Sequence, residues 1–189
     1  MKIILGSASA RRQTILKAMG YEFDIMPADI NEKAIRDSDP EKLTMTLANA
    51  KADALTPRIK ESAILITSDL VVVFQGKIIE KPESKEEAYR VLNAYNQEPI
   101  STVCSVVVTN TKTGKRFFGT DVSIVYFNPI PPENIKEFVE SGKVFEHAGS
   151  FAAENPLFAL FVKKIDGTLE SIMGMPVDLT KRLIEEAFA

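Results

Sequence analysis

The stretch at 5–12, Leu-Gly-Ser-Ala-Ser-Ala-Arg-Arg, has the residue types and spacing of an anion-binding loop. The apolar run at 2–5 predicts a short buried strand, and the sequence at 13–19 predicts a helix. A loop of small residues at a helix N-terminus presents unpaired backbone N–H groups, and the helix dipole favours an anion there. Arg11 and Arg12 add planar cations suited to phosphate oxygens. The alternative is an N-capped helix with two surface arginines.

One carboxylate, Asp69, interrupts the most strand-like run of the chain, residues 63–74. A charge among apolar and β-branched residues is costly unless a cation or a metal ion meets it. Asp69 therefore has the setting of a general base or metal ligand, with a pKa tuned by burial and by nearby cations. The alternative is a bulge or break at Ser68 and Asp69, with the carboxylate bonded to backbone N–H groups. The two interpretations are compatible, because bulges often lie beside active sites.

Lys51 lies on the apolar stripe of a helix that is predicted to begin at Pro40, four residues from both Leu47 and Leu55. An ammonium group in that position either extends to solvent or meets an anion, because an unpaired buried cation is costly. The sequence leaves both outcomes open.

Two more charged residues complete the candidate site. Lys81 follows a hairpin predicted over 75–80, so it returns toward Asp69 along the neighbouring strand. Glu32 belongs to an acidic segment that is otherwise typical of a solvated loop, and near a phosphate site it is a candidate ligand for a divalent cation. Several cations around one embedded carboxylate predict a polyphosphate site, because transfer at phosphorus depends on positioning and charge neutralisation.

The elements that position these residues alternate between strands and helices early in the chain, and a long hairpin follows. Strands are predicted over 2–5, 23–26, 63–74, 77–80, 100–109, 116–127 and 158–165. Helices are predicted over 13–19, 85–95 and 177–187, with another beginning at Pro40 and a short one opened by Pro131-Pro132-Glu133 that runs to about Ser141. This order predicts an α/β protein with a mixed sheet flanked by helices, formed by one domain over 1–189.

The composition narrows the class of protein. A chain of 189 residues with 45% hydrophobic residues can bury one sizeable core, and its net charge of −3 argues against general nucleic-acid binding. Its single cysteine, Cys104, excludes an internal disulfide and a cysteine metal site, which fits a reducing compartment. No stretch has the length of a membrane span or the pattern of a signal peptide, so we expect a cytoplasmic protein without a membrane partner.

Motifs in the same order across essentially the whole chain resemble those of the Maf (septum-formation) family. They are Ser7-Ala8-Ser9-x-Arg11-Arg12, Leu47-Ala48-x-x-Lys51-Ala52, Ser68-Asp69-x-Val71-Val72, Lys81-Pro82, Ala148-Gly149-Ser150-Phe151-x-x-Glu154 and Gly174-Met175-Pro176. The chain departs from the pattern at Ala10, where many members have proline. The resemblance implies an elongated fold similar to inosine triphosphatases, with two lobes around a central cleft, and it allows a homodimer.

The resemblance also implies an enzyme, a nucleoside triphosphate pyrophosphatase that cleaves the bond between the α and β phosphorus atoms. Asp69 would be the proton acceptor that activates water. Glu32 and Asp69 would hold a divalent cation, Mg²⁺ or Mn²⁺. The residues that would hold the triphosphate are Ser7, Arg12, Lys51 and Lys81.

The preferred base follows from residues in which two branches of the family differ. Arg11 next to Arg12 is similar to the branch of dTTP/UTP pyrophosphatases, although Leu70 stands where that branch has threonine. The pair Ser68-Asp69 and the loop ending at Glu154 are similar to the 7-methylguanosine triphosphate branch. A carboxylate at Glu154 accepts hydrogen bonds from a guanine edge and tolerates a positively charged methylated purine, whereas a pyrimidine edge suits an amide better. We therefore expect a modified purine nucleotide, with dTTP or UTP as the alternative.

Two other classes of protein remain as alternatives. A non-catalytic, nucleotide-binding regulator of cell division would keep the cations but would not need Asp69. A purely structural α/β domain would need neither Lys51 nor Asp69.

Overall fold

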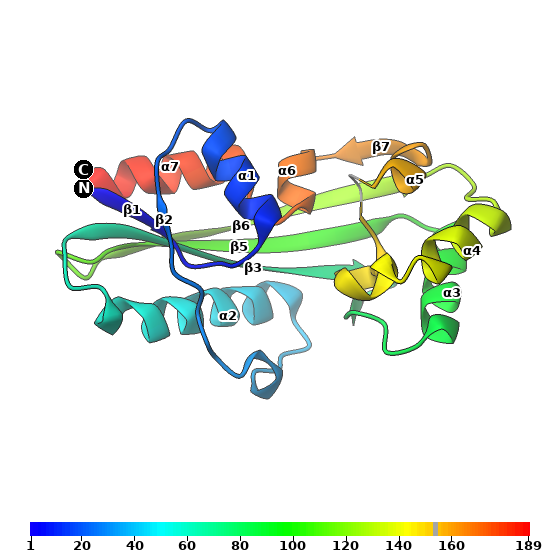
Figure 1. Ribbon diagram of the computed structural model, residues 1–189, viewed down its shortest axis with the longest axis horizontal. Coiled ribbons are helices and arrows are strands. Elements are labelled where there is room, and N and C mark those ends of the chain that lie inside the picture. Colours follow the sequence, from blue (N-terminus) through cyan, green and yellow to red (C-terminus); the bar gives the residue numbers. More distant parts are fainter. Residues whose placement is uncertain (153–154) are drawn as a thin grey trace. The chain divides into compact units, whose positions relative to one another are not determined.

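The structure is a computed structural model that describes residues 1–152 and 155–189. Within these residues, a seven-stranded mixed sheet has the order β2-β1-β3-β5-β6-β7, with β4 paired to β3 (Figure 1). The strands are β1 (Lys2–Leu5), β2 (Asp24–Ile25), β3 (Ala63–Phe74), β4 (Lys77–Ile79), β5 (Ile100–Asn110), β6 (Arg116–Phe127) and β7 (Val162–Asp166). The helices are α1 (Ala10–Ala18), α2 (Pro40–Leu55), α3 (Lys85–Ala94), α4 (Pro132–Glu140), α5 (Pro156–Ala159), α6 (Leu169–Ile172) and α7 (Val177–Phe188). The predicted mixed α/β architecture is confirmed.

The chain folds into two compact units. The first unit comprises Met1–Leu70, Val103–Asp121 and Glu170–Ala189, and the second comprises Val71–Thr102 and Val122–Leu169. Each of the long strands β3, β5 and β6 begins in one unit and ends in the other.

The first unit is a sheet covered by helices on both faces. In Figure 1, α1 and α7 lie on one face of the strands and α2 lies on the other. Alternate residues of a strand point to opposite faces, and the core divides accordingly. One cluster joins Ile3, Leu5, Ile64 and Ile66 to Ile15, Leu16, Leu183 and Ile184. The other joins Ile4, Ala63 and Leu65 to Ala48, Ala52 and Leu55. Both faces of β3 are therefore buried, which explains its continuous apolar sequence.

Strands β1 and β3 run parallel, with Leu5 opposite Ile66. The backbone N–H of Gly6 donates to the carbonyl of Ile66 at 2.8 Å, so the loop that follows β1 starts alongside β3. A Cβ on Gly6 would lie 2.6 Å from Thr67 Cγ2, so only glycine fits this close approach. The carboxyl ends of parallel strands are where α/β sheets place ligands.

The second unit is held together by aromatic rings. Each ring contacts the next at centroid distances of 4.6 to 6.0 Å, through Phe74, Tyr95, Phe127, Phe151, Phe158 and Phe138. Strands β3 and β4 form the predicted hairpin, and its turn residues Gln75 and Gly76 both have positive φ. Two positive φ angles in a two-residue turn match the right-handed twist of the paired strands. Ala88, Val91 and Leu92 form the buried face of α3.

Three elements differ from the prediction. Helix α1 starts at Ala10, three residues before the predicted start, and β2 covers only Asp24–Ile25 of the strand predicted over 23–26. The apolar run at 158–165, predicted as one strand, divides between α5 and β7. Short apolar runs do not distinguish a strand from a buried helical turn, and Phe158 is buried in α5 against Phe138.

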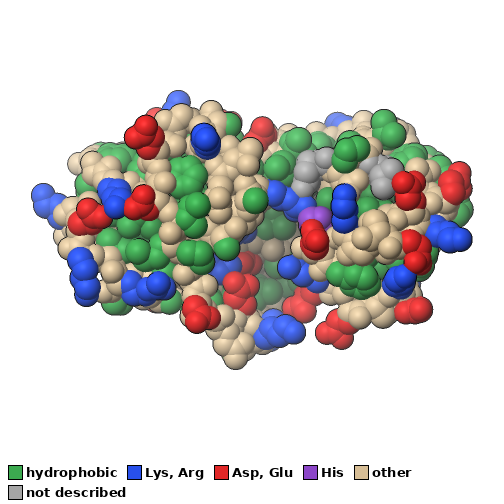
Figure 2. All heavy atoms as spheres, viewed as in Figure 1, with side chains coloured by type: hydrophobic (Ala, Val, Ile, Leu, Met, Phe, Trp, Pro, Cys, Tyr) green, Lys and Arg blue, Asp and Glu red, His purple; other side chains and the backbone are tan. Residues whose placement is uncertain are grey.

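The surface carries interspersed charges. Acidic and basic side chains are mixed over the face shown in Figure 2, as the net charge of −3 would suggest. Among the described residues, no helix combines the length and apolarity needed to cross a membrane.

Candidate active site

Asp69 lies in the middle of β3, which runs without a break from Ala63 to Phe74, so the alternative of a break at Ser68 and Asp69 is not observed. The alternation that sends Ala63 and Leu65 toward α2 continues through Thr67, whose hydroxyl donates to the carbonyl of Ala48 at 2.8 Å. Asp69 is the next residue in this series and also faces α2. The strand period thus directs one carboxylate into the layer between sheet and helix.

Helix α2 supplies the cation that meets this carboxylate. Lys51 follows Ala48 by three residues and precedes Leu55 by four, which places it on the buried face of the helix. Its ammonium lies 2.6 Å from Oδ1 of Asp69, and each residue is 7% exposed. Of the two outcomes that the sequence left open for Lys51, the meeting with an anion is the one observed.

Glu32 is a second acid beside the same ammonium. It begins the 3₁₀ turn η1 (Glu32–Ala34), and its Oε1 lies 3.1 Å from Nζ of Lys51. Its side chain is 52% exposed, unlike that of Asp69. Two carboxylates, one buried and one half-exposed, therefore converge on one lysine.

Burial dominates the electrostatics of Asp69. Desolvation raises the pKa of this carboxyl above its usual value, although the neighbouring charges of Lys51 and Arg12 act in the opposite direction. A carboxylate with a raised pKa is a better proton acceptor than an ordinary aspartate at neutral pH.

The loop after β1 lies next to the same part of β3. Ser7 is 9% exposed, and its hydroxyl accepts hydrogen bonds from the backbone N–H of Ser9 and from Nη1 of Arg12. Nη1 of Arg12 also donates to the carbonyl of Ser68 at 3.0 Å, and Nε donates to the carbonyl of Gly174 at 3.0 Å. Ser9 occupies the N-cap of α1 without a side-chain capping bond. Arg12 therefore joins the loop to the residue that precedes Asp69.

The structure thus brings together five of the predicted site residues within the first unit: Ser7, Arg12, Glu32, Lys51 and Asp69. Arg11 is half-buried on α1, and Leu70 packs partly buried against the core. Lys81 is exposed and belongs to the second unit. Glu154 lies outside the described residues.

Two of the predicted motifs meet in the second unit. The backbone N–H of Gly149 donates to the carbonyl of Glu80, the residue before Lys81, at 3.0 Å. The hydroxyl of Tyr95 donates to the carbonyl of Gly149 at 2.7 Å. A Cβ on Gly149 would lie 2.7 Å from Val72 Cγ1, and its φ is +65°, so this position requires glycine. The loop that leads toward Glu154 is therefore fixed against the hairpin that ends near Lys81.

The carboxylate oxygens of Asp69 and Glu32, next to Lys51, are suitable ligands for a hard divalent cation. Mg²⁺ prefers carboxylate and phosphate oxygens and is held by one or two carboxylates together with substrate phosphates. Asp69 and Glu32 supply carboxylates of this kind, and both lie within 3.1 Å of one ammonium, so a positive charge already occupies the space between them.

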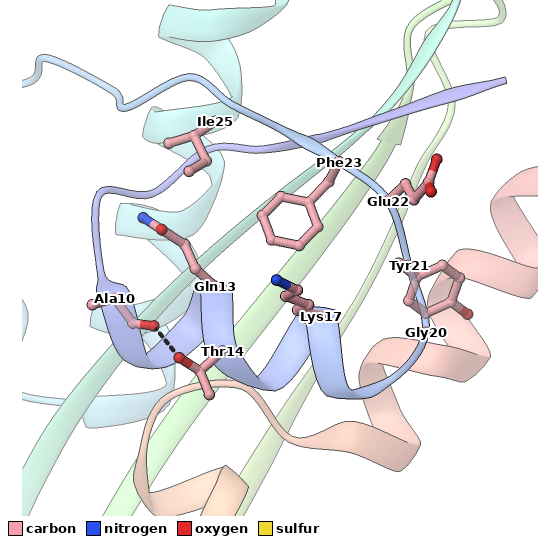
Figure 3. A pocket seen from close by; sticks show the side chains of 9 residues that line it. All are labelled: Ala10, Gln13, Thr14, Lys17, Gly20, Tyr21, Glu22, Phe23 and Ile25. Carbon is pink, nitrogen blue, oxygen red and sulfur yellow. Dashed lines mark hydrogen bonds between the residues drawn. The ribbon is translucent and has the colours of Figure 1, made fainter.

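A separate hollow of about 680 Å³ is lined by α1 and by the segment at 20–25 (Figure 3). Gln13 and Lys17 of α1 line it together with Phe23 and Ile25. Neither Asp69 nor Lys51 is among its lining residues, so it is distinct from the candidate site.

Comparison with known proteins shows the family of this chain. Residues 2–187 match the family model described as Maf-like protein. The chain belongs to the Maf family. A 7-methyl-GTP pyrophosphatase of Dictyostelium discoideum is 44% identical, with 97% of this chain and 96% of that protein covered. A dTTP/UTP pyrophosphatase of Carboxydothermus hydrogenoformans is 34% identical, with 98% of each covered.

A solved structure of a nucleoside-triphosphatase, a dITP/XTP pyrophosphatase, of Mycobacterium abscessus matches part of this chain. Its TM-score is 0.44 at 10% identity, and the match covers 69% of this chain and 76% of that one.

The site residues predicted from the sequence do not include Ser68 and Gly174, whose carbonyls both accept hydrogen bonds from Arg12. Ser68 contributes its carbonyl to Arg12 and its hydroxyl to the carbonyl of Gly174 at 3.3 Å. The alternation of side chains along β3 turns Ser68 to the face opposite Asp69, and this pattern could have indicated Ser68. The contact of Gly174 with Arg12 spans 162 positions of the chain, and no local pattern predicts it.

Proposed function

We propose that this protein is a nucleoside triphosphate pyrophosphatase that releases a nucleoside monophosphate and pyrophosphate. The observation that carries the proposal is the buried carboxylate of Asp69, held 2.6 Å from Lys51 in β3, three residues beyond the parallel pairing of this strand with the end of β1. The loop with Ser7 and Arg12 lies beside it. The activities named for the two curated relatives support the same reaction.

In this proposal Asp69 accepts the proton of the attacking water. The water oxygen forms a bond to phosphorus, the bridging P–O bond of the α–β anhydride breaks, and the proton passes to the carboxylate. Within the described residues, Asp69 forms its side-chain bond through Oδ1, with Lys51, which leaves Oδ2 to take the proton. A positioned general base of this kind typically contributes about 10²- to 10⁴-fold to the rate.

The cations bind the triphosphate and neutralise the departing pyrophosphate. Ser7, Arg12 and Lys51 of the first unit are the proposed contacts, and Lys81 of the second unit is proposed as a further one. Lys51 has a double role, because it also neutralises Asp69 until phosphate oxygens approach.

Asp69 and Glu32 are the proposed ligands of a divalent cation, Mg²⁺ or Mn²⁺. Such an ion, when bound with the nucleotide, would withdraw charge from the phosphate oxygens. The two carboxylates fit it because they are hard oxygen donors that already converge on a positive charge.

The proposed substrate is a methylated purine nucleotide such as 7-methylguanosine triphosphate. The higher identity to the 7-methyl-GTP pyrophosphatase, 44% against 34%, supports this choice over dTTP or UTP. Glu154 is the proposed acceptor for the guanine edge, and Arg11 and Leu70 are proposed to contribute to the choice of base. The proposed setting is the cytoplasm.

The test is pyrophosphate release from a panel of nucleoside triphosphates with Mg²⁺. We expect 7-methylguanosine triphosphate to have the highest kcat/KM, and Glu154→Gln to move the preference toward dTTP and UTP. A wild-type preference for dTTP or UTP would favour the alternative substrate. An unchanged ranking in the Glu154→Gln variant would remove Glu154 from base recognition.

Asp69→Asn tests the chemistry itself. We expect this variant to retain nucleotide binding and to lose turnover by about 10²-fold or more. Asp53→Asn is the matched control, since Asp53 on α2 is exposed and pairs with Arg116. Nucleotide binding without turnover in the wild type would indicate the non-catalytic regulator instead.

A further inference from the structure

We propose that the backbone carbonyl of Gly174 is a positioning group of the phosphate site, because it fixes the guanidinium of Arg12. The loop before α7, which contains Gly174, is thereby linked through Arg12 to Ser68, the residue before Asp69. The inference rests on the proposed pyrophosphatase function and concerns the first unit only.

The carbonyl of Gly174 accepts two side-chain hydrogen bonds. Nε of Arg12 donates to it at 3.0 Å, and the hydroxyl of Ser68 donates to it at 3.3 Å. The same guanidinium donates through Nη1 to the carbonyl of Ser68 at 3.0 Å and to the hydroxyl of Ser7 at 3.3 Å. Three segments, remote from one another in sequence, thus meet at one planar group.

This arrangement determines which part of Arg12 remains for a ligand. The guanidinium is a rigid fork, so bonds at Nε and Nη1 fix its plane. Among the described residues, Nη2 has no hydrogen-bond partner. Nη2 is therefore the nitrogen that can meet a phosphate oxygen, and Gly174 determines where it points.

Position 174 requires glycine for two reasons. Its φ is +92°, a backbone angle that residues other than glycine rarely adopt. A Cβ at this position would also lie 3.1 Å from Nε and 3.2 Å from Nη2 of Arg12. The next residue, Met175, is fully buried and its N–H donates to the carbonyl of Glu170 at 3.0 Å. Because the loop is anchored in this way, we expect an added Cβ to shift the guanidinium by a few tenths of an ångström.

The experiment compares Gly174→Ala with Gly20→Ala. Gly20 has a similar φ of +87°, but a Cβ there meets nothing within 4 Å, so this variant has the backbone strain without the contact to Arg12. The measurements are the thermal midpoint, kcat and KM for the preferred nucleotide, and the affinity for inorganic pyrophosphate.

We expect Gly174→Ala to raise KM and to weaken pyrophosphate binding, each by about tenfold or more, as for the loss of one charged hydrogen bond. Gly20→Ala should keep both values while losing a similar amount of thermal stability. If Gly174 had a purely structural role, Gly174→Ala would lower only the fraction of active protein. Equal KM and equal pyrophosphate affinity in Gly174→Ala and Gly20→Ala would overturn the inference. Absence of turnover and of pyrophosphate binding in the wild type would instead refute the proposed function.

Discussion

The ammonium of Lys51 and the carboxylate of Asp69 form a buried ion pair, with Nζ 2.6 Å from Oδ1. Glu32 reaches the same ammonium from the solvent side at 3.1 Å. A buried carboxylate is tolerated when a cation and hydrogen bonds compensate its desolvation, so each residue of the pair depends on the other. The candidate site is therefore also a point on which the stability of the first unit depends.

Replacing Lys51 by Met should lower the free energy of unfolding by about 3 kcal/mol, because Asp69 would remain buried without its cation. Adding Asp69→Asn to that variant should restore much of the loss, since the neutral amide needs no partner charge. Neither variant should release pyrophosphate at the wild-type rate. Urea unfolding at pH 7 measures the stabilities.

Lys2→Met is the matched control for this pair of variants. Lys2 forms ion pairs of 2.6 and 2.9 Å with Asp24 and Glu61, but these groups are exposed to solvent. Its unfolding midpoint should stay close to that of the wild type. If the double variant is no more stable than Lys51→Met alone, Asp69 and Lys51 are not energetically coupled.

Gly6→Ala should destabilise the protein by about 1–3 kcal/mol through overpacking. The new Cβ would lie 2.6 Å from Thr67 Cγ2 and 2.8 Å from Leu55 Cδ1, between two packed layers. Because the loop with Ser7 begins here, kcat/KM should fall together with stability.

Gly119→Ala is the comparison for Gly6→Ala, because the added Cβ would be equally close to its nearest neighbour. Its Cβ would also lie 2.6 Å from a neighbour, but that neighbour is the flexible end of Leu179. Urea unfolding should show a smaller loss for this variant. An equal loss in both variants would mean that the packing around Gly6 yields as readily as the end of the Leu179 side chain.

The thiol of Cys104 gives a prediction for alkaline pH. Burial raises its pKa to about 12, above the value of about 8.5 expected for the unfolded chain. The buried, protonated thiol therefore makes its full contribution to the free energy of unfolding below about pH 8.5. This contribution is lost progressively as the pH rises from there toward 12. The stability advantage of the wild type over Cys104→Ala should shrink between pH 8 and pH 10 in urea unfolding. A constant difference across that range would contradict the assigned burial of the thiol.

Periodicity predicted much of this site. The two-residue repeat of β3 and the three-to-four-residue repeat of α2 are both readable in the sequence, and together they place Asp69 and Lys51 in one layer. The capped start of α2 was also readable, since Asp39 accepts hydrogen bonds from the N–H groups of Glu41 and Lys42.

The remainder depends on contacts that no local pattern encodes. The carbonyl of Gly174 meets Arg12 only because the loop before α7 returns to the N-terminal loop. The run at 158–165 has the pattern of a strand because short apolar runs look alike, whereas the ring of Phe158 packs against Phe138 from a short helix. Tertiary packing determines both the contact of Gly174 with Arg12 and the helical conformation at Phe158. Glycine in a loop and phenylalanine in a core are ordinary, so the residue types alone give no signal.

The hydroxyl of Ser150 provides a last test, in the second unit. Ser150 is fully buried with a φ of +54°, and its Oγ has no hydrogen-bond partner among the described residues. An unsatisfied buried hydroxyl costs about 1–3 kcal/mol, and the left-handed backbone adds strain for any residue except glycine. Ser150→Ala should therefore unfold at higher urea than the wild type, and Ser150→Gly should do so as well because it also relieves the strain.

Thr109→Val is the control for Ser150, because Thr109 also has a buried hydroxyl without a partner among the described residues but has no positive φ. It should gain stability from the loss of the hydroxyl alone. A Ser150→Ala variant that is less stable than the wild type, while Thr109→Val gains, would show that the Ser150 hydroxyl is satisfied in solution. The loop at 148–150 would then be held by a bond through Oγ, in addition to the contacts of Gly149 with Glu80 and Tyr95.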